Sequence, residues 1–160
     1  APTALEETVA VLNENPNVGM VYTDYQVIDA TDQVKSYGRR CRIPYSKDRL
    51  LLDFMTFHFR LIRRSVFEQA GGIDDEFQCA EDYDLCLRLS EITEIRRIQK
   101  PLYHYRIHPE SVSHEMRLEQ VHWSREAISR ALERRGLSER FEVDLQIREQ
   151  FRLKRRNPDG

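Results

Sequence analysis

A helix-like pattern leads directly into a strand-like one at the start of the chain, and this junction constrains the fold more than any other feature. Apolar residues repeat at helical spacing from Leu5 to Leu12, and Pro16 ends the pattern. The stretch VGMVYTDYQVIDA (18–30) is rich in β-branched and aromatic residues, as strands are. A helix followed by a strand is typical of α/β units, so we expect an α/β domain.

Further patterns along the chain extend this α/β order. Two expected capping boxes, Thr3 with Glu6 and Ser65 with Glu68, would each begin a helix. We expect strands over 34–37 (in a hairpin with 18–30), 57–64, 94–98 and 102–108, with Pro101 in the turn between the last two. We expect further helices over 48–54, from about residue 82, over 115–135 and over 143–154.

The composition argues against several functional classes. Lys and Arg total 25 and Asp and Glu total 27, and the net charge of −2 gives no reason to expect a nucleic-acid partner. No apolar run reaches the ~20 residues of a membrane span. The start of the sequence lacks a signal-peptide layout. The cysteines Cys41, Cys79 and Cys86 form no CxxC pair and are interpreted as reduced thiols. We therefore expect a cytoplasmic protein without a transmembrane segment, with the cytoplasmic face of a membrane as the other candidate location.

The stretch AEDYDLCLRL (80–89) places three acids in four positions, and three interpretations are open. Asp82 and Asp84 have the D-x-D spacing with which two carboxylates bind one divalent ion. The helix indicated by Leu85 and Leu89 disfavours this interpretation, because helical residues two apart point roughly 200° apart. The acids could instead stabilise the helix N-terminus, or one could be a general base facing a cleft. The local pattern does not separate these last two.

Five histidines raise the alternative of a zinc site. His104 and His108 on one strand would lie about 13 Å apart. His114 and His122 on one helix would lie roughly 12 Å apart. Neither pair can hold a zinc ion by itself, so a zinc hydrolase is disfavoured.

Four segments, in this order, resemble the family 2 inverting glycosyltransferases of the GT-A (Rossmann-like) fold. They are VGMVYTDYQVID (18–29), FRLIRRSVFEQAGGIDDEF (59–77), AEDYDLCLRL (80–89) and PLYHYRIHPESVS (101–113). The most specific parts are the acidic pair after GG-x-D-x-x-F and the pattern Y-R-x-H-x-x-S-x-S. The resemblance extends over about residues 1–135.

This resemblance implies an activity and its substrates. A nucleotide-sugar donor, with UDP-sugars among the candidates, would pass its sugar to a hydroxyl of a saccharide or other acceptor. A divalent ion, Mg²⁺ or Mn²⁺, would bridge the donor phosphates to a D-x-D loop. Asp82 would be the general base that deprotonates the acceptor, with Glu81 as its orienting neighbour.

The resemblance also implies binding residues. Arg106, Ser111 and Ser113 would contact the donor diphosphate, and His108 would bind the metal or the phosphate. Asp24 would lie beside the donor cleft. The two glycines Gly71 and Gly72 would shape the acceptor loop, although a simple helix C-cap explains Gly71 equally well.

The sequence departs from the family pattern at its start, where the nucleotide-binding half and the D-x-D loop have no counterpart. We therefore expect residues 1–114 to be the carboxyl-terminal, acceptor-side half of a GT-A domain, and residues 115–160 a helical extension. The main metal ligands would then lie outside this chain, and the fragment alone would be inactive and prone to self-association. Two alternatives stay open, namely a non-catalytic interaction module on this scaffold and a helical adaptor that works through residues 115–154.

Overall fold

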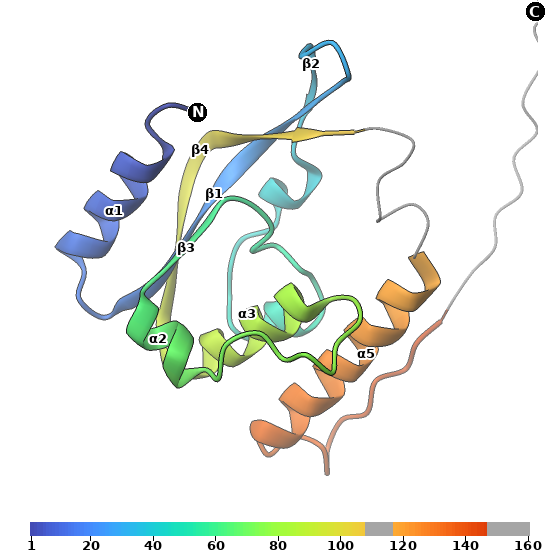
Figure 1. Cartoon of the computed structure of the whole chain (residues 1–160). Coiled ribbons are helices and arrows are strands. Elements are labelled where there is room, and N and C mark those ends of the chain that lie inside the picture. The colour runs from blue at the N-terminus through green and yellow to red at the C-terminus, as the bar shows by residue number, and fades with distance from the viewer. Residues whose placement is uncertain (108–116, 147–160) are drawn as a thin grey trace, which may run out of the picture.

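A mixed sheet of four strands forms the centre of the computed structural model, which describes residues 1–107 and 117–146 (Figure 1). The elements, with η marking short 3-10 helices, are α1 (Ala4–Glu14), β1 (Val18–Ile28), β2 (Val34–Tyr37), η1 (Arg39–Arg42), η2 (Arg49–Leu51), β3 (Arg60–Ile62), α2 (Arg64–Gln69), α3 (Glu81–Ile92), β4 (Glu94–Arg106) and α5 (Arg117–Arg134). The expected α/β class, with a mixed sheet and flanking helices, is confirmed.

Strand β1 is the central strand of this sheet. It pairs in parallel with β4 along its whole length, from Val18 opposite Glu94 to Ile28 opposite Arg106. On its other edge β1 pairs antiparallel with β3 and, further along, with β2, as the expected hairpin requires. Because β1 and β4 are parallel, their carboxyl ends lie at the same end of the sheet. Functional side chains that follow these strands are therefore brought together there.

Several local expectations are wrong. Residues 94–106 form one strand rather than two, and Pro101 pairs with Asp24 at a register irregularity instead of making a turn. Proline is tolerated there because β4, among the described residues, is an edge strand. The expected strand over 57–64 is limited to β3, and the expected helix over 48–54 to η2. Residues 143–146 have no regular structure, and the rest of the helix expected over 143–154 lies outside the described residues.

Neither expected capping box forms. The Thr3 hydroxyl donates to the Glu7 carboxylate at 2.9 Å instead of capping a backbone N–H. Ser65 lies inside α2, which begins one residue earlier at Arg64 and has no side-chain cap. Both helices are therefore held by packing rather than by their caps.

The two faces of β1 pack against different helices. Val18 and Val21 form a small cluster with Leu12 of α1. Met20 and Tyr22 belong to a larger cluster that includes the buried leucines of α3 and the alanines of α5. Figure 1 accordingly shows α1 on one side of the sheet and α3 with α5 on the other.

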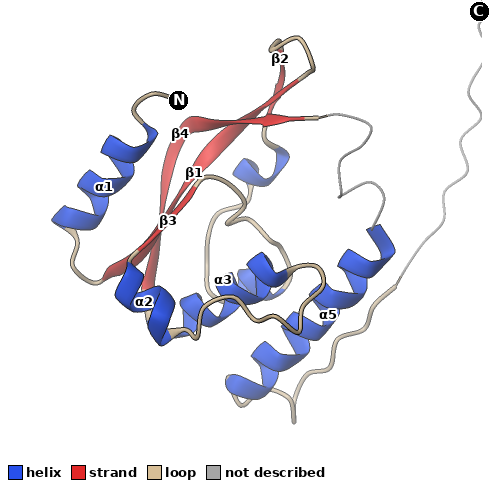
Figure 2. Ribbon diagram, viewed as in Figure 1, coloured by secondary structure: helices blue, strands red, loops and turns tan. Residues whose placement is uncertain are grey.

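Helix α5 packs against α3 and against the loop between α2 and α3. Ala127 and Ala131 are fully buried in the larger cluster. The Trp123 ring lies 5.3 Å from the ring of Phe77, which belongs to the loop between α2 and α3 that Figure 2 shows beside α5. Arg130 pairs with Asp74 of the same loop at 3.2 Å. The described part of the expected helical extension therefore shares the core of the residues that precede it, while the boundary at residue 114 stays a prediction.

Candidate active site

A pocket of about 790 Å³ lies where the carboxyl ends of β1 and β4 meet the amino end of α3. Its walls come from β1, the segment from β2 to η1, the loop before β3, the start of α3 and the start of α5. The lining residues are Tyr25, Val27, Ser36, Tyr37, Arg39, Arg40, Phe54, Phe57, His58, Gln78, Cys79, Ala80, Glu81, Asp82, Tyr83, Tyr105, Ile107, Gln120 and Ser124. The pocket thus combines aromatic rings with charges of both signs.

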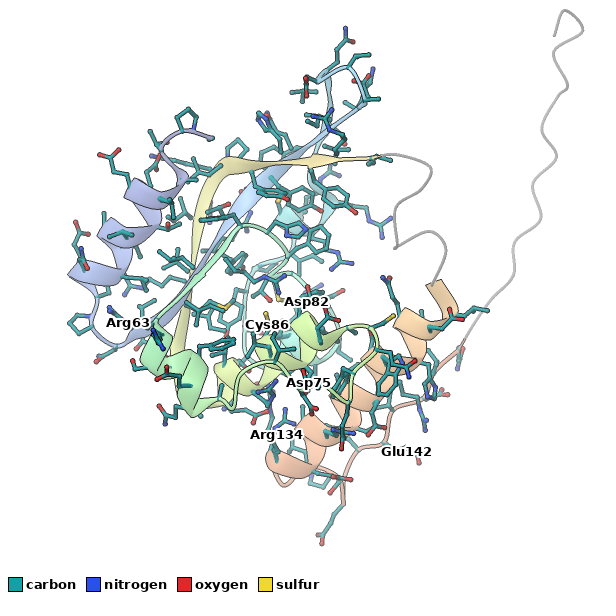
Figure 3. All side chains as sticks on the ribbon, in the orientation of Figure 1. Arg63, Asp75, Asp82, Cys86, Arg134 and Glu142 are labelled. Atoms are coloured by element: carbon teal, nitrogen blue, oxygen red, sulfur yellow. The ribbon has the colours of Figure 1, made fainter. Side chains whose placement is uncertain are left out.

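Asp82 is held at this pocket by Arg60 of β3. Its Oδ2 accepts a hydrogen bond from Arg60 Nη2 at 2.7 Å, and 36% of its side chain stays exposed. Arg60 Nη1 also donates to the Asp82 carbonyl oxygen and to Cys86 Sγ, each at 3.3 Å. Figure 3 labels Asp82 and Cys86 on α3, and their four-residue spacing puts them on one face of the helix. Arg60 therefore fixes the direction of a carboxylate that solvent and ligands can still reach.

The surroundings keep the Arg60 guanidinium charged. Burial would lower the pKa of Arg60, but Cys86 and Asp82 beside it outweigh that effect and raise the pKa. Asp82 Oδ1 has no hydrogen bond within residues 1–107 and 117–146. One oxygen of the carboxylate is thus anchored, and the other is free to accept a proton from a ligand.

The three acids of 81–84 diverge, as helical geometry requires. Glu81 lines the pocket beside Asp82, whereas Asp84 turns to the opposite side, where its Oδ2 binds Arg88 Nε at 2.8 Å. The Asp84 side chain is only 2% exposed. Asp82 and Asp84 therefore cannot bind one ion together, and Asp84, an acid of the first turn of α3, is a buried ion-pair partner.

An aromatic wall borders the pocket on the side of β4. The His58 imidazole stacks on the Tyr105 ring with centroids 5.6 Å apart, and it lies 4.8 Å from Tyr103 and 4.0 Å from Phe57. Burial, reinforced by the positive charge of Arg60, lowers the pKa of His58 to about 4. The imidazole is therefore neutral at pH 7, and the wall presents uncharged ring faces to a ligand.

Asp24 lies beneath this pocket rather than in it. Its side chain is 2% exposed, and its two oxygens accept hydrogen bonds from Arg97 at 2.6 and 2.9 Å. The Tyr37 hydroxyl donates to the same carboxylate. Because Tyr37 and Tyr25 line the pocket, Asp24 supports its wall from behind. A direct contact with substrate stays a prediction that this arrangement does not favour.

Gly71, Gly72 and Arg106, the other expected binding residues that the structure describes, lie apart from the pocket lining. Gly71 and Gly72 end α2 with positive φ values of 85° and 70°, which favour glycine. Arg106 donates to Asp32 and to the carbonyl oxygen of Asp29 at 2.7 Å, which ties β4 to the hairpin. His108, Ser111 and Ser113 lie outside the described residues.

Metal binding finds no support in the described geometry. Within residues 1–107 and 117–146, no three His, Cys, Asp or Glu side chains are placed to hold an ion. The same part of the chain contains no helix that is both long and apolar enough to cross a bilayer.

Three features of the pocket were not expected from the sequence, namely the Arg60 anchor, Arg40 and the aromatic wall. The sequence did contain a signal for Arg60. In FHFRLIRR it precedes Leu61, so the two side chains lie on opposite faces of β3, and Leu61 packs toward α1. A charge on the core side of a short strand requires a partner there. The wall had no such signal, because its rings come from distant segments.

No protein-family model matches the chain. It is 36% identical over 107 residues to the O-antigen biosynthesis protein RfbC of Myxococcus xanthus, a match that covers 66% of this chain and 8% of that protein. It is 29% identical over 112 residues to chondroitin synthase of Escherichia coli, covering 70% of the chain and 16% of the relative. It is 22% identical over 112 residues to hyaluronan synthase of Pasteurella multocida, covering 70% of the chain and 11% of the relative. The chain's relatives include glycosyltransferases. The matched part of the chain spans less than a fifth of the length of each of these relatives.

Proposed function

We propose that this chain forms the acceptor side of an inverting glycosyltransferase of family 2 with a GT-A fold. The observation that carries the proposal is the Asp82 carboxylate, anchored by Arg60 on one oxygen and open to an aromatic-lined pocket on the other. The pocket lies at the carboxyl end of a parallel strand pair, where α/β proteins bind their ligands. The relatives named chondroitin synthase and hyaluronan synthase support sugar transfer as the reaction class.

In the proposed reaction Asp82 is the general base. An acceptor hydroxyl donates its hydrogen bond to Asp82 Oδ1, and the proton passes to this oxygen while the hydroxyl oxygen attacks the anomeric carbon of the donor. The bond from that carbon to the nucleoside diphosphate breaks, and its electron pair leaves with the diphosphate. Attack opposite the leaving group inverts the sugar carbon. Arg60 holds the carboxylate in line, and Glu81 beside it adds a second negative charge to the pocket lining.

The proposed reaction needs a nucleotide-sugar donor and a divalent metal ion. Mg²⁺ or Mn²⁺ would supply charge neutralisation for the leaving diphosphate, yet the described residues do not form a site for it. We expect its main ligands, and most contacts to the nucleotide-sugar donor, to come from residues that are not part of this chain. The cytoplasmic location likewise stays a prediction.

Asp82→Asn in the full-length protein tests the proposal. The amide keeps the size and one acceptor oxygen but cannot take a proton, so kcat should fall by roughly 10²- to 10⁴-fold. Donor binding and the melting temperature should change little, because the side chain is partly exposed. Asp75→Asn is the matched control, since it removes the same charge from an exposed loop position outside the pocket lining. Transfer that survives Asp82→Asn would instead favour the non-catalytic interaction module.

A further inference from the structure

Arg40 is a partly buried cation without an acidic partner. Its guanidinium lies 4.2 Å from the Phe57 ring centroid and 5.2 Å from that of Phe54. Its Nη1 donates to the Phe54 carbonyl oxygen at 3.0 Å. It forms no ion pair with any carboxylate in the described part of the chain, whereas the arginines Arg60, Arg88 and Arg97, which are also partly buried, each bind an aspartate.

This arrangement leaves binding capacity unused. A guanidinium offers five N–H donors in a planar fork, and the protein engages Arg40 through one hydrogen bond and two ring faces. Burial lowers the pKa of Arg40, and the nearby Asp82 carboxylate opposes that effect only in part. Since Asp82 is already bound to Arg60, it does not satisfy the charge. A partly buried charge without a counter-ion is unfavourable, and an anionic ligand would offset part of that cost.

Arg40 also has the right neighbours for a sugar ligand. It lines the same pocket as Asp82, and Arg39 of the same 3-10 turn is an exposed second cation on the lining. The rings of His58 and Tyr105 stack nearly parallel, and Phe57 meets Tyr105 edge-on, so these rings give the pocket an apolar side against which a pyranose face can pack. A ligand that stacks there can place a hydroxyl near Asp82 and an anionic substituent near Arg40.

We propose that Arg40 binds a carboxylate on the acceptor saccharide, so that the pocket selects acidic sugars. This inference rests on the proposed function and names the acceptor class for the same site. The donor diphosphate is a less suitable partner, because Glu81 and Asp82 line the same pocket and would repel a multiply charged group more strongly than a single carboxylate. A planar carboxylate, moreover, matches the guanidinium fork through two parallel hydrogen bonds.

Two sugars that differ only at C6, where one has a carboxylate and the other a hydroxymethyl group, test the inference by NMR titration of the full-length protein. Wild type should bind methyl β-glucuronide roughly 10- to 100-fold more tightly than methyl β-glucoside. Arg40→Gln should abolish that preference. Arg42→Gln is the matched control, because it removes a charge from the same turn at an exposed position outside the pocket lining. Arg40→Lys keeps the charge without the planar fork and should retain part of the preference.

Two results would overturn the inference. One is a wild-type protein with no preference for the glucuronide, and the other is a preference that survives Arg40→Gln. A pyrophosphate titration separates the sources of the anion, since affinity for pyrophosphate that falls with Arg40→Gln while glucuronide binding is unchanged would assign Arg40 to the donor.

These titrations need no turnover, so the inference and the proposed function can fail separately. A protein that prefers the glucuronide but transfers no sugar refutes only the proposed function. Transfer to acidic and neutral acceptors with equal KM refutes only the role of Arg40.

Discussion

The two sides of the first turn of α3 show how surroundings divide the roles of similar residues. Asp82 and Asp84 are two positions apart, and each is bound to one arginine, at 2.7 and 2.8 Å respectively. Asp82 stays 36% exposed beside a pocket, whereas Asp84 is 2% exposed between α3 and α5. Arg134 is a second, more distant ion-pair partner of Asp84, with its Nη1 3.8 Å from Asp84 Oδ1. One pair is open to ligands, and the other is closed inside the protein.

Neighbouring acids in one cluster can therefore have separate roles, set by what each side chain contacts. Helical geometry sends the two side chains in different directions, and the partner helices decide what each one meets. The open pair is suited to proton transfer because a ligand can approach it. The closed pair is suited to holding α3 in place, because removing one member would leave a buried charge without compensation.

The largest effect on stability should come from opening the closed pair. Asp84→Ala should lower the free energy of unfolding of the chain by about 3–5 kcal/mol, because Arg88 would stay buried without its carboxylate. Urea unfolding followed by circular dichroism measures this. Asp75→Ala is the control, since it removes the same charge from an exposed loop position, and it should change the free energy by less than about 0.5 kcal/mol. The double replacement Asp84→Leu with Arg88→Met should recover much of the loss, and a double variant as unstable as the single one would contradict this account.

A smaller effect, on rate instead of stability, should follow from releasing the open pair. Arg60→Gln removes the anchor of Asp82, so the carboxylate should sample orientations that do not face the acceptor. We expect kcat to fall roughly 10- to 100-fold with little change in the KM for the donor. Arg60→Lys should restore part of the rate, since it can still reach one oxygen. A rise in KM at constant kcat would show that Arg60 binds substrate rather than positioning the base.

Much of the fold could be predicted from the sequence, and the reasons are local. The strand at 18–28 and the helix at 81–92 have strong composition and periodicity, so they are found where expected. The turn expected at Pro101 is wrong, because the pairing of β4 with β1 along the whole strand outweighs the local preference of proline for turns. Capping patterns misled at Thr3 and Ser65, because packing sets where both helices begin.

The candidate site was less predictable than the fold. Asp82 and Glu81 could be named because they follow each other in a motif, and both line the pocket. Arg60, Arg40 and the ring of His58 could not be placed with them, since only the folded chain brings 40, 58, 60 and 82 together. Contacts between residues so far apart in sequence leave no periodic signal.

A moderate effect on stability should appear as the pH falls. His58 has its pKa lowered to about 4 in the fold, against a usual value near 6.5. Between about pH 6.5 and pH 4 the unfolded chain therefore binds a proton at His58 that the folded chain does not bind. The free energy of unfolding should decline over this range by on the order of 2 kcal/mol, a value reduced for the partial exposure of the imidazole. Urea unfolding at pH 7.5 and pH 4.5 should show a smaller difference for His58→Gln than for wild type. Equal differences would mean that His58 charges freely in the fold.

The smallest effect should come from a pair that looks identical to the closed one in sequence spacing and distance. Arg64 and Glu68 are four residues apart on α2 and lie 2.8 Å from each other, as Asp84 and Arg88 do on α3. Their side chains are 91% and 60% exposed, so water and salt screen the attraction. Arg64→Ala should therefore change the free energy of unfolding by less than about 0.5 kcal/mol. This change should vanish at high ionic strength, because salt screens exposed charges. A loss comparable with that of Asp84→Ala would show that the ion-pair distance, and not burial, decides the energy of these pairs.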